Sequence, residues 1–146
     1  LSAAMRPSCI QLTAYIADRY RSAVEIGFGG VIDVVRALKE RGLRVAASDI
    51  RRYSFQGLRT FVDDITVPKI SLYQGAQVLY AVWPPVELVP YMRCVAEAVF
   101  ARAIIIKPLS GEYTGGRIEG KGNGVFFVQD VNLRRGDICV QKSKAL

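Results

Sequence analysis

The feature that most constrains this chain is a short apolar run that ends in a cluster of glycines. Residues 22–26 form the run around Glu25, and Gly27, Gly29 and Gly30 follow almost at once. Glycine has no Cβ, so a turn built from it lets the backbone approach a ligand closely. A helix that starts after such a turn adds the positive end of its dipole. The pattern therefore predicts a site for a nucleotide-bearing ligand at the end of a buried strand.

The chain alternates between apolar runs typical of strands and stretches with helical periodicity. Strands are predicted at residues 22–26, 43–48, 61–62, 78–82 and 103–106. Helices are predicted over 9–20 with Ser8 as N-cap, at the stripe of Val31, Val34, Val35 and Leu38, and at the stripe of Leu88, Tyr91, Met92, Val95 and Val99. Strands that alternate with helices predict a parallel sheet covered on both faces.

The pattern changes in the last third of the chain. Residues 110–124 form a Gly-rich loop, which we interpret as a hairpin or lid. Two apolar runs, 125–128 and 138–140, then follow without a helix between them, and the turn signals in 132–137 would join them as a hairpin. The sequence therefore predicts an α/β fold whose mostly parallel sheet gains antiparallel edge strands at its C-terminal end.

Composition narrows the classes of function. A length of 146 residues fits one domain, residues 1–146, with residues 1–21 as an N-terminal helical segment. No apolar run approaches the roughly 20 residues that cross a bilayer, and the start lacks a signal-peptide pattern, so we expect a cytoplasmic protein without membrane contact. The absence of histidine excludes Ser-His and Cys-His nucleophiles. Because Cys9, Cys94 and Cys139 lack metal-ligand spacing, we predict no metal site.

The net charge of +7 favours anionic partners such as phosphates or nucleic acid. Basic and aromatic residues interleave at Arg51, Arg52, Tyr53, Phe55 and Arg59. Such interleaving is typical of single-stranded nucleic-acid binding, and a solvated loop explains the same run. Nucleic acid therefore stays open as a partner.

Three acidic residues accompany the glycine turn. Glu25 is unusual in a buried strand, because an unpaired buried charge is costly unless it faces a cationic group such as an amino acid ammonium. Asp49 ends the second strand, where a carboxylate can accept both hydroxyls of a ribose. Asp64 ends the third strand. The alternatives are an ion pair for Glu25, a turn cap for Asp49 and a solvated turn for Asp64.

These motifs resemble the Rossmann-like methyltransferases that bind S-adenosylmethionine (SAM). Glu25-Ile26-Gly27-Phe28-Gly29 is similar to their first motif, Asp49 matches the residue that holds the ribose, and Asp64 matches the residue beside the adenine. Over nearly its whole length the chain also resembles a small uncharacterised archaeal protein family, through the runs 24–27, 61–66, 79–80, 84–88 and 108–112.

The resemblance implies a Rossmann-like, methyltransferase-like three-layer sandwich with SAM as its cofactor. The cofactor-binding residues that it implies are Glu25, Gly27, Phe28, Gly29, Gly30, Asp49, Ile50 and Asp64.

The segment after the fourth strand departs from the pattern of amino-directed methyltransferases. They resemble one another in an Asn or Asp, two prolines and an aromatic, whereas this chain has Trp83-Pro84-Pro85-Val86. Trp83 is a candidate to stack a planar substrate, and ordinary packing is its alternative. Glu87 is a candidate base, and a first-turn carboxylate favoured by the helix dipole is its alternative.

Three functional hypotheses follow from these residues. The first is a small SAM-binding methyltransferase of unknown substrate, with a homodimer or a partner completing its active site. The second is a non-enzymatic nucleotide- or cofactor-binding regulatory module, which the replacement of the polar acceptor by Trp83 favours. The third is a basic RNA-associated protein.

Overall fold

The computed structural model describes residues 4–110 and 112–131 of the chain. In chain order the elements are η1 (Pro7–Cys9), α1 (Ile10–Arg19), β1 (Ser22–Ile26), α2 (Asp33–Glu40), β2 (Arg44–Asp49), β3 (Arg59–Val62), η2 (Ile70–Tyr73), β4 (Val78–Val82), η3 (Val86–Leu88), α3 (Val89–Ala98), β5 (Ala103–Lys107), β6 (Arg117–Glu119), η4 (Gly122–Gly124) and β7 (Phe126–Asp130).

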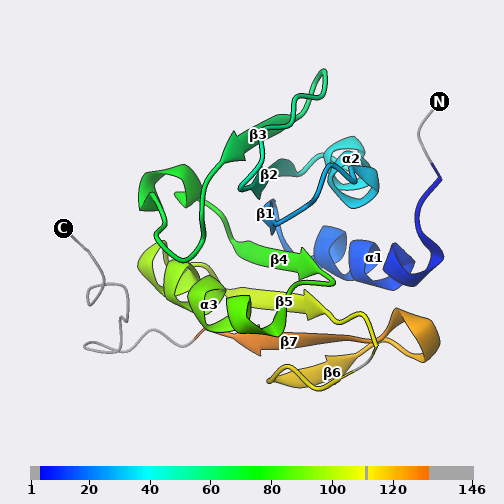
Figure 1. Cartoon of the computed structure of the whole chain (residues 1–146). Helices are drawn as coiled ribbons and strands as arrows, with labels where there is room; N and C mark the ends of the chain where they lie inside the picture. The colour runs from blue at the N-terminus through cyan, green and yellow to red at the C-terminus, as the bar shows by residue number, and fades with distance from the viewer. Residues whose placement is uncertain (1–3, 111, 132–146) are drawn as a thin grey trace.

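The strands form one sheet in the order β3-β2-β1-β4-β5-β7-β6. The first five pair in parallel, whereas β7 is antiparallel to β5 and β6 is antiparallel to β7. In Figure 1 the arrows of β4 and β5 point one way and that of β7 the other. The strand order reverses between β1 and β4, and open α/β sheets bind ligands outside the carboxyl ends of their strands at such a reversal.

Helices cover both faces of the sheet, which confirms the predicted three-layer sandwich (Figure 1). One apolar cluster joins Leu12 of α1 and Leu38 of α2 to Tyr80 of β4. A second cluster joins Met92 of α3 to Leu79, the neighbour of Tyr80 in β4. Successive strand side chains point to opposite faces, and every residue of β1, β4 and β5 is buried. The central strands are therefore buried on both faces, and most of their side chains are apolar, with Glu25 and Lys107 as charged exceptions.

Three predictions about the helices need correction. Ser8 does not cap α1, because a 3-10 turn over Pro7–Cys9 precedes the helix and no side chain caps it. Val31 is exposed and lies before α2, since its N–H closes a turn on the carbonyl of Phe28 and delays the helix to Asp33. Tyr91 of α3 is also exposed rather than on the buried face.

The second antiparallel edge strand that the structure describes is β6, which lies within the Gly-rich segment predicted as a hairpin or lid. A Cβ at Gly116 would overlap the backbone carbonyl of Val128, so glycine is required for this close approach to β7. The edge strand predicted at residues 138–140 lies outside the described residues.

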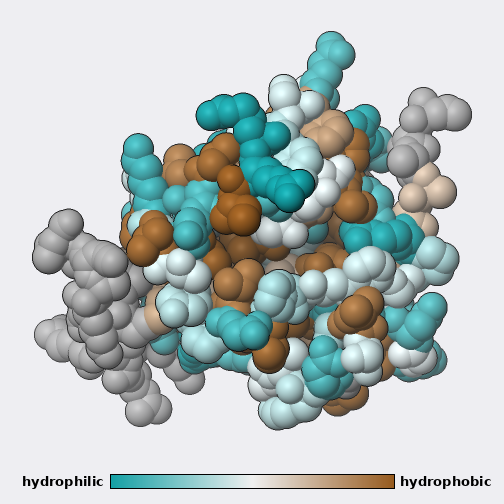
Figure 2. Space-filling model, viewed as in Figure 1, coloured by the Kyte–Doolittle hydropathy of each residue, from teal (hydrophilic) through white to brown (hydrophobic). Residues whose placement is uncertain are grey.

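Apolar side chains at the surface do not gather into one large face in the view of Figure 2, where they form separate patches among hydrophilic groups. Val62, Val67, Val86 and Leu109 are among the exposed ones. Among the helices within 4–110 and 112–131, none has the length and apolar character that a membrane span needs.

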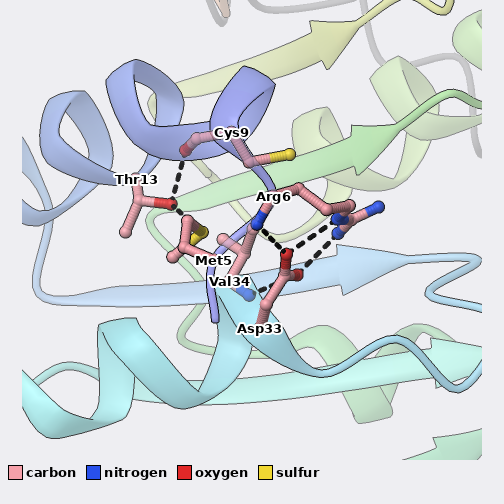
Figure 3. A network of polar contacts seen from close by, with 6 residues as sticks. All are labelled: Met5, Arg6, Cys9, Thr13, Asp33 and Val34. Atoms are coloured by element: carbon pink, nitrogen blue, oxygen red, sulfur yellow. Dashed lines mark hydrogen bonds and ion pairs between the residues drawn. The ribbon is translucent and has the colours of Figure 1, made fainter. Parts of the chain in front are cut away.

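The segment before α1 is fastened to the start of α2 by an ion pair (Figure 3). The backbone N–H and the guanidinium of Arg6 donate to the Asp33 carboxylate at 2.6–3.0 Å, and the Val34 N–H donates to it at 2.7 Å. Burial alone would raise the pKa of Asp33, but the hydrogen bonds from Arg6 outweigh it and hold that pKa below its ordinary value.

Replacing Asp33 with Asn is expected to lower the free energy of unfolding by about 2 kcal/mol, because it leaves the half-buried Arg6 guanidinium without its counter-ion. Urea denaturation at pH 7 measures the change. The difference from the native chain should shrink in acid, as the pH falls below the ordinary pKa of an aspartic acid and then through the lowered pKa of Asp33.

The control is Asp130→Asn, which removes the exposed pair with Arg117 and should change stability by less than about 0.5 kcal/mol. Equal effects of the two substitutions would show that the Arg6–Asp33 pair does not fasten the segment.

Candidate functional site

The turn between β1 and α2 requires glycine where the sequence has it. Gly27 and Gly29 have φ angles of +67° and +61°, which side chains with a Cβ rarely adopt. The N–H groups of Gly27 and Phe28 both donate to the Ser48 carbonyl, at 2.8 and 3.2 Å, and so fix the turn against β2. The turn thus holds the carboxyl end of β1 beside that of β2.

Asp49 is the last residue of β2 and faces this turn. Its carboxylate accepts the N–H of Gly29 at 2.8 Å and that of Arg51 at 3.0 Å. No salt bridge to Asp49 occurs among the residues that the structure describes. An ionised carboxylate has about four acceptor positions, so two remain for a ligand. The backbone orients this carboxylate without neutralising it.

A cavity of about 420 Å³ opens at the carboxyl ends of β1, β2 and β3. Its lining residues are Ile26, Gly27, Ser48, Asp49, Ile50, Asp63, Asp64, Ile65, Thr66 and Leu88. The volume falls in the range of roughly 300–1,000 Å³ that is usual for small-molecule sites. Apolar side chains with a few carboxylates among them suit a ligand that has a flat apolar ring and hydroxyl groups.

Two neighbouring carboxylates at the end of β3 have different roles. Asp63 accepts the Tyr73 hydroxyl at 2.6 Å and the Lys69 N–H at 3.1 Å, so it holds the loop that follows. Asp64 is exposed, and its carboxylate accepts only from Thr66 within the described residues, through the N–H and the hydroxyl. Hydrogen bonds from Thr66 hold the pKa of Asp64 below its ordinary value. Asp64 is therefore ionised and open to solvent.

The structure brings Gly27, Asp49, Ile50 and Asp64 together around this cavity. Sequence reasoning missed Ile65 and Leu88, which supply much of its apolar wall. Leu88 is part of a helical stripe, and such a stripe predicts only packing. Ile65 is a single apolar residue between polar neighbours, so no sequence pattern marks it as a binding residue.

Phe28 is predicted to bind the cofactor, but its side chain lies elsewhere. The ring is 4% exposed and packs against Tyr53 and Phe55, with ring centroids 5.1 and 6.3 Å away. A Cβ on Gly30 would lie 2.7 Å from the Tyr53 ring, so Gly30 makes room for this packing. The aromatic residues of the basic 50–60 segment are thus used in an internal cluster.

Glu25 does not line the cavity either. Its side chain is 1% exposed and lies beside Tyr80, its register partner on β4, and its Oε1 has no hydrogen-bond partner among the described residues. Burial raises the pKa of Glu25 to about 8, although the Tyr80 hydroxyl and Arg6 partly oppose the rise. Glu25 is therefore a buried, mainly protonated acid at neutral pH, two residues before Gly27 in the chain.

The two candidate catalytic residues lie beyond the cavity, after β4. Trp83 follows the strand with a φ angle of +57°, and the Arg6 guanidinium lies 5.2 Å from its ring centroid. Glu87 is exposed within η3. Neither residue lines the cavity that contains Asp49.

Another cavity, of about 450 Å³, lies at the amino ends of β1 and β2, where Ser22 and Arg44 are among its lining residues. It is slightly larger, but no carboxylate lines it, and it opens on the edge of the sheet opposite to the glycine turn. Ligands of open α/β sheets bind at the carboxyl ends, so the cavity beside Asp49 is the better candidate.

Sequence comparison finds a matching family over residues 9–130, described as an uncharacterised protein family (UPF0146). A UPF0146 protein of Archaeoglobus fulgidus is 37% identical over 121 residues, covering 82% of this chain and 92% of the relative. One from Pyrococcus abyssi is 34% identical over 110 residues, covering 70% and 83%. These names assign no activity.

Among solved structures, a SAM-dependent methyltransferase from Agrobacterium tumefaciens matches with a TM-score of 0.55 and 11% identity, over 75% of this chain and 47% of that one. The MycE methyltransferase of the mycinamycin pathway, in complex with Mg and SAH, matches with a TM-score of 0.56 and 13% identity, over 94% and 52%. The chain spans about half the length of these methyltransferases. At such low identity the likeness shows a shared methyltransferase-like fold.

Proposed function

The chain belongs to the uncharacterised protein family UPF0146, and from the site we propose that it binds SAM beside Asp49 and acts as a small methyltransferase. The observation that carries this proposal is the Asp49 carboxylate. It lies in a cavity of ligand size, is held by two backbone N–H groups, and keeps two acceptor positions free.

The cavity fits the adenosine part of SAM. Two free acceptor positions on one carboxylate match the two hydroxyls of a ribose. Ile50, Ile65 and Leu88 offer apolar surface to a purine ring, and the ionised Asp64 would accept its amino group. Gly27 has no side chain to obstruct the ligand where it passes the turn. The solved neighbours with SAM or SAH in their descriptions support this assignment.

Methyl transfer needs no covalent intermediate on the protein. Bound SAM would supply an electrophilic methyl group, and the chain's residues would hold donor and acceptor in line. Trp83 and Glu87 follow β4, next to β1 in the sheet, so they lie on the side where an acceptor would approach. We assign Trp83 to acceptor stacking and Glu87 to proton removal, as proposals.

A regulatory SAM-binding module is the second candidate function. The specific observation in its favour is Trp83, which replaces the polar acceptor residue expected of an amino-directed enzyme. In that case SAM would bind at Asp49 without turnover. Transfer of labelled methyl groups from SAM to small molecules, proteins or RNA separates this module from an enzyme.

Calorimetric titration tests the proposal directly. SAM and SAH are expected to bind saturably at a ratio of one per chain, and nicotinamide dinucleotide is expected not to bind, because Ile32 stands where its fingerprint needs a third glycine. A folded protein that fails to bind both SAM and SAH would contradict the proposed function.

A further inference from the structure

Lys107, the last residue of β5, is a buried cation without a counter-ion in the described part of the chain. The side chain is 5% exposed, and its ammonium donates to the carbonyls of Asn123 and Val125, each at 2.9 Å. No carboxylate pairs with it among residues 4–110 and 112–131. An ammonium has three donors, so one remains unused. Burial lowers the pKa of Lys107, which is the cost of holding this charge away from water.

Trp83, the residue that follows the neighbouring strand β4, is held in an uncommon backbone conformation. Its φ angle of +57° lies in the left-handed region, and its N–H donates to the Lys107 carbonyl at 2.7 Å. Such conformations are strained in non-glycine residues and cluster at functional sites. The strain places a large flat side chain, 42% exposed, beside the buried lysine.

Both residues line one cavity of about 380 Å³ at the carboxyl ends of β4 and β5. Its other lining residues are Ser8, Pro108, Leu109, Ser110, Gly122, Asn123 and Val125. No acidic residue is among them. The carboxylate of Glu112 is bound by the Ser110 hydroxyl and does not line the cavity. This cavity shares no lining residue with the one that contains Asp49.

We propose that this second cavity binds a small planar anion, an aromatic carboxylate or phosphate, with its ring on Trp83 and its charged group on the free N–H of Lys107. Stacking and a charge-assisted hydrogen bond are each favourable here because the ring is partly exposed and the ammonium is desolvated.

Trp83 is the chain's only tryptophan, so its fluorescence reports on this cavity alone. Benzoate and phenyl phosphate are expected to change the emission saturably. Benzamide lacks the charge and cyclohexanecarboxylate lacks the ring, and each should bind about tenfold more weakly than benzoate. Equal affinities for benzoate and benzamide would overturn the role of Lys107, and equal affinities for benzoate and cyclohexanecarboxylate would overturn that of Trp83.

The variant Lys107→Met should weaken benzoate binding by about tenfold or more. The control is Lys121→Met, which changes an exposed lysine in the same way and should leave the affinity for benzoate unchanged. Similar effects of both substitutions would reduce the interaction to general attraction by the net charge. If Lys107→Met does not fold, the four-ligand comparison on the native chain still decides.

The variant Asp49→Asn separates this proposal from the proposed function. Benzoate should still alter Trp83 fluorescence in this variant, since Asp49 does not line the second cavity. Loss of benzoate binding on this change would contradict two separate sites. Failure of the native protein to bind SAM, with benzoate binding intact, would reject the methyltransferase and keep the anion site.

Discussion

Asp49→Asn is expected to weaken SAM binding by about 30-fold or more, which corresponds to about 2 kcal/mol. Hydrogen bonds to a charged group contribute about 1.5–3 kcal/mol each, and Asp49 has two free acceptor positions for a ribose diol. Asn keeps one oxygen for the Gly29 N–H, so the turn is retained, but it loses the charge. Calorimetry with SAM and SAH measures the change.

Asp18→Asn is the matched control, because Asp18 is an exposed acid near the end of α1 and lines none of the cavities described above. Its SAM affinity should equal that of the native chain. Circular dichroism and the melting temperature show whether each variant is folded. A folded Asp49→Asn protein with native SAM affinity would mean that the ribose does not bind there.

Glu25→Gln is expected to remove most of the pH dependence of stability between pH 5 and pH 8. Folding raises the pKa of this acid from 4.5 to about 8. The stability that its proton contributes is complete below about pH 4.5 and is lost as the pH rises through 8. The native chain should therefore lose about 3 kcal/mol of unfolding free energy across this range, and the Gln variant should lose much less.

Within the described residues, Glu25 is the carboxyl group whose raised pKa falls at the end of this pH range. No histidine is present to titrate between pH 5 and 8. The pKa values of Asp33, Asp64 and Glu112 are lowered, so these acids change stability at more acidic pH. Burial raises the pKa of Cys9, which places its titration above the window.

Urea denaturation at several pH values measures the effect, with Glu40→Gln as the control for the same chemical change at an exposed site. The control should keep the native slope. A native chain whose stability is flat from pH 5 to 8 would show that Glu25 is not held protonated by burial.

Local sequence patterns were enough to predict the central strands, the glycine turn and the acidic residues at the strand ends. Strands at 22–26 and 78–82 were predicted at their observed bounds, because a buried parallel strand is a continuous apolar run. The glycines at 27 and 29 were predicted to form the turn, since positive φ angles select glycine. Asp49 and Asp64 could be placed near one edge, because parallel strands end at the same side of a sheet.

Only the tertiary structure decided which of these side chains reach the cavity. Glu25 and Ile26 point to opposite faces of β1, and the sequence shows this alternation without showing which face a helix covers. The packing of α1 and the Arg6 segment buries Glu25 beside Tyr80, and the packing of Tyr53 and Phe55 buries Phe28. The same holds for Lys107 and Trp83, which come together only because β4 and β5 pair in register. Contacts between residues distant in the chain carry no local signal, so burial, and with it charge state and access, had to come from the fold.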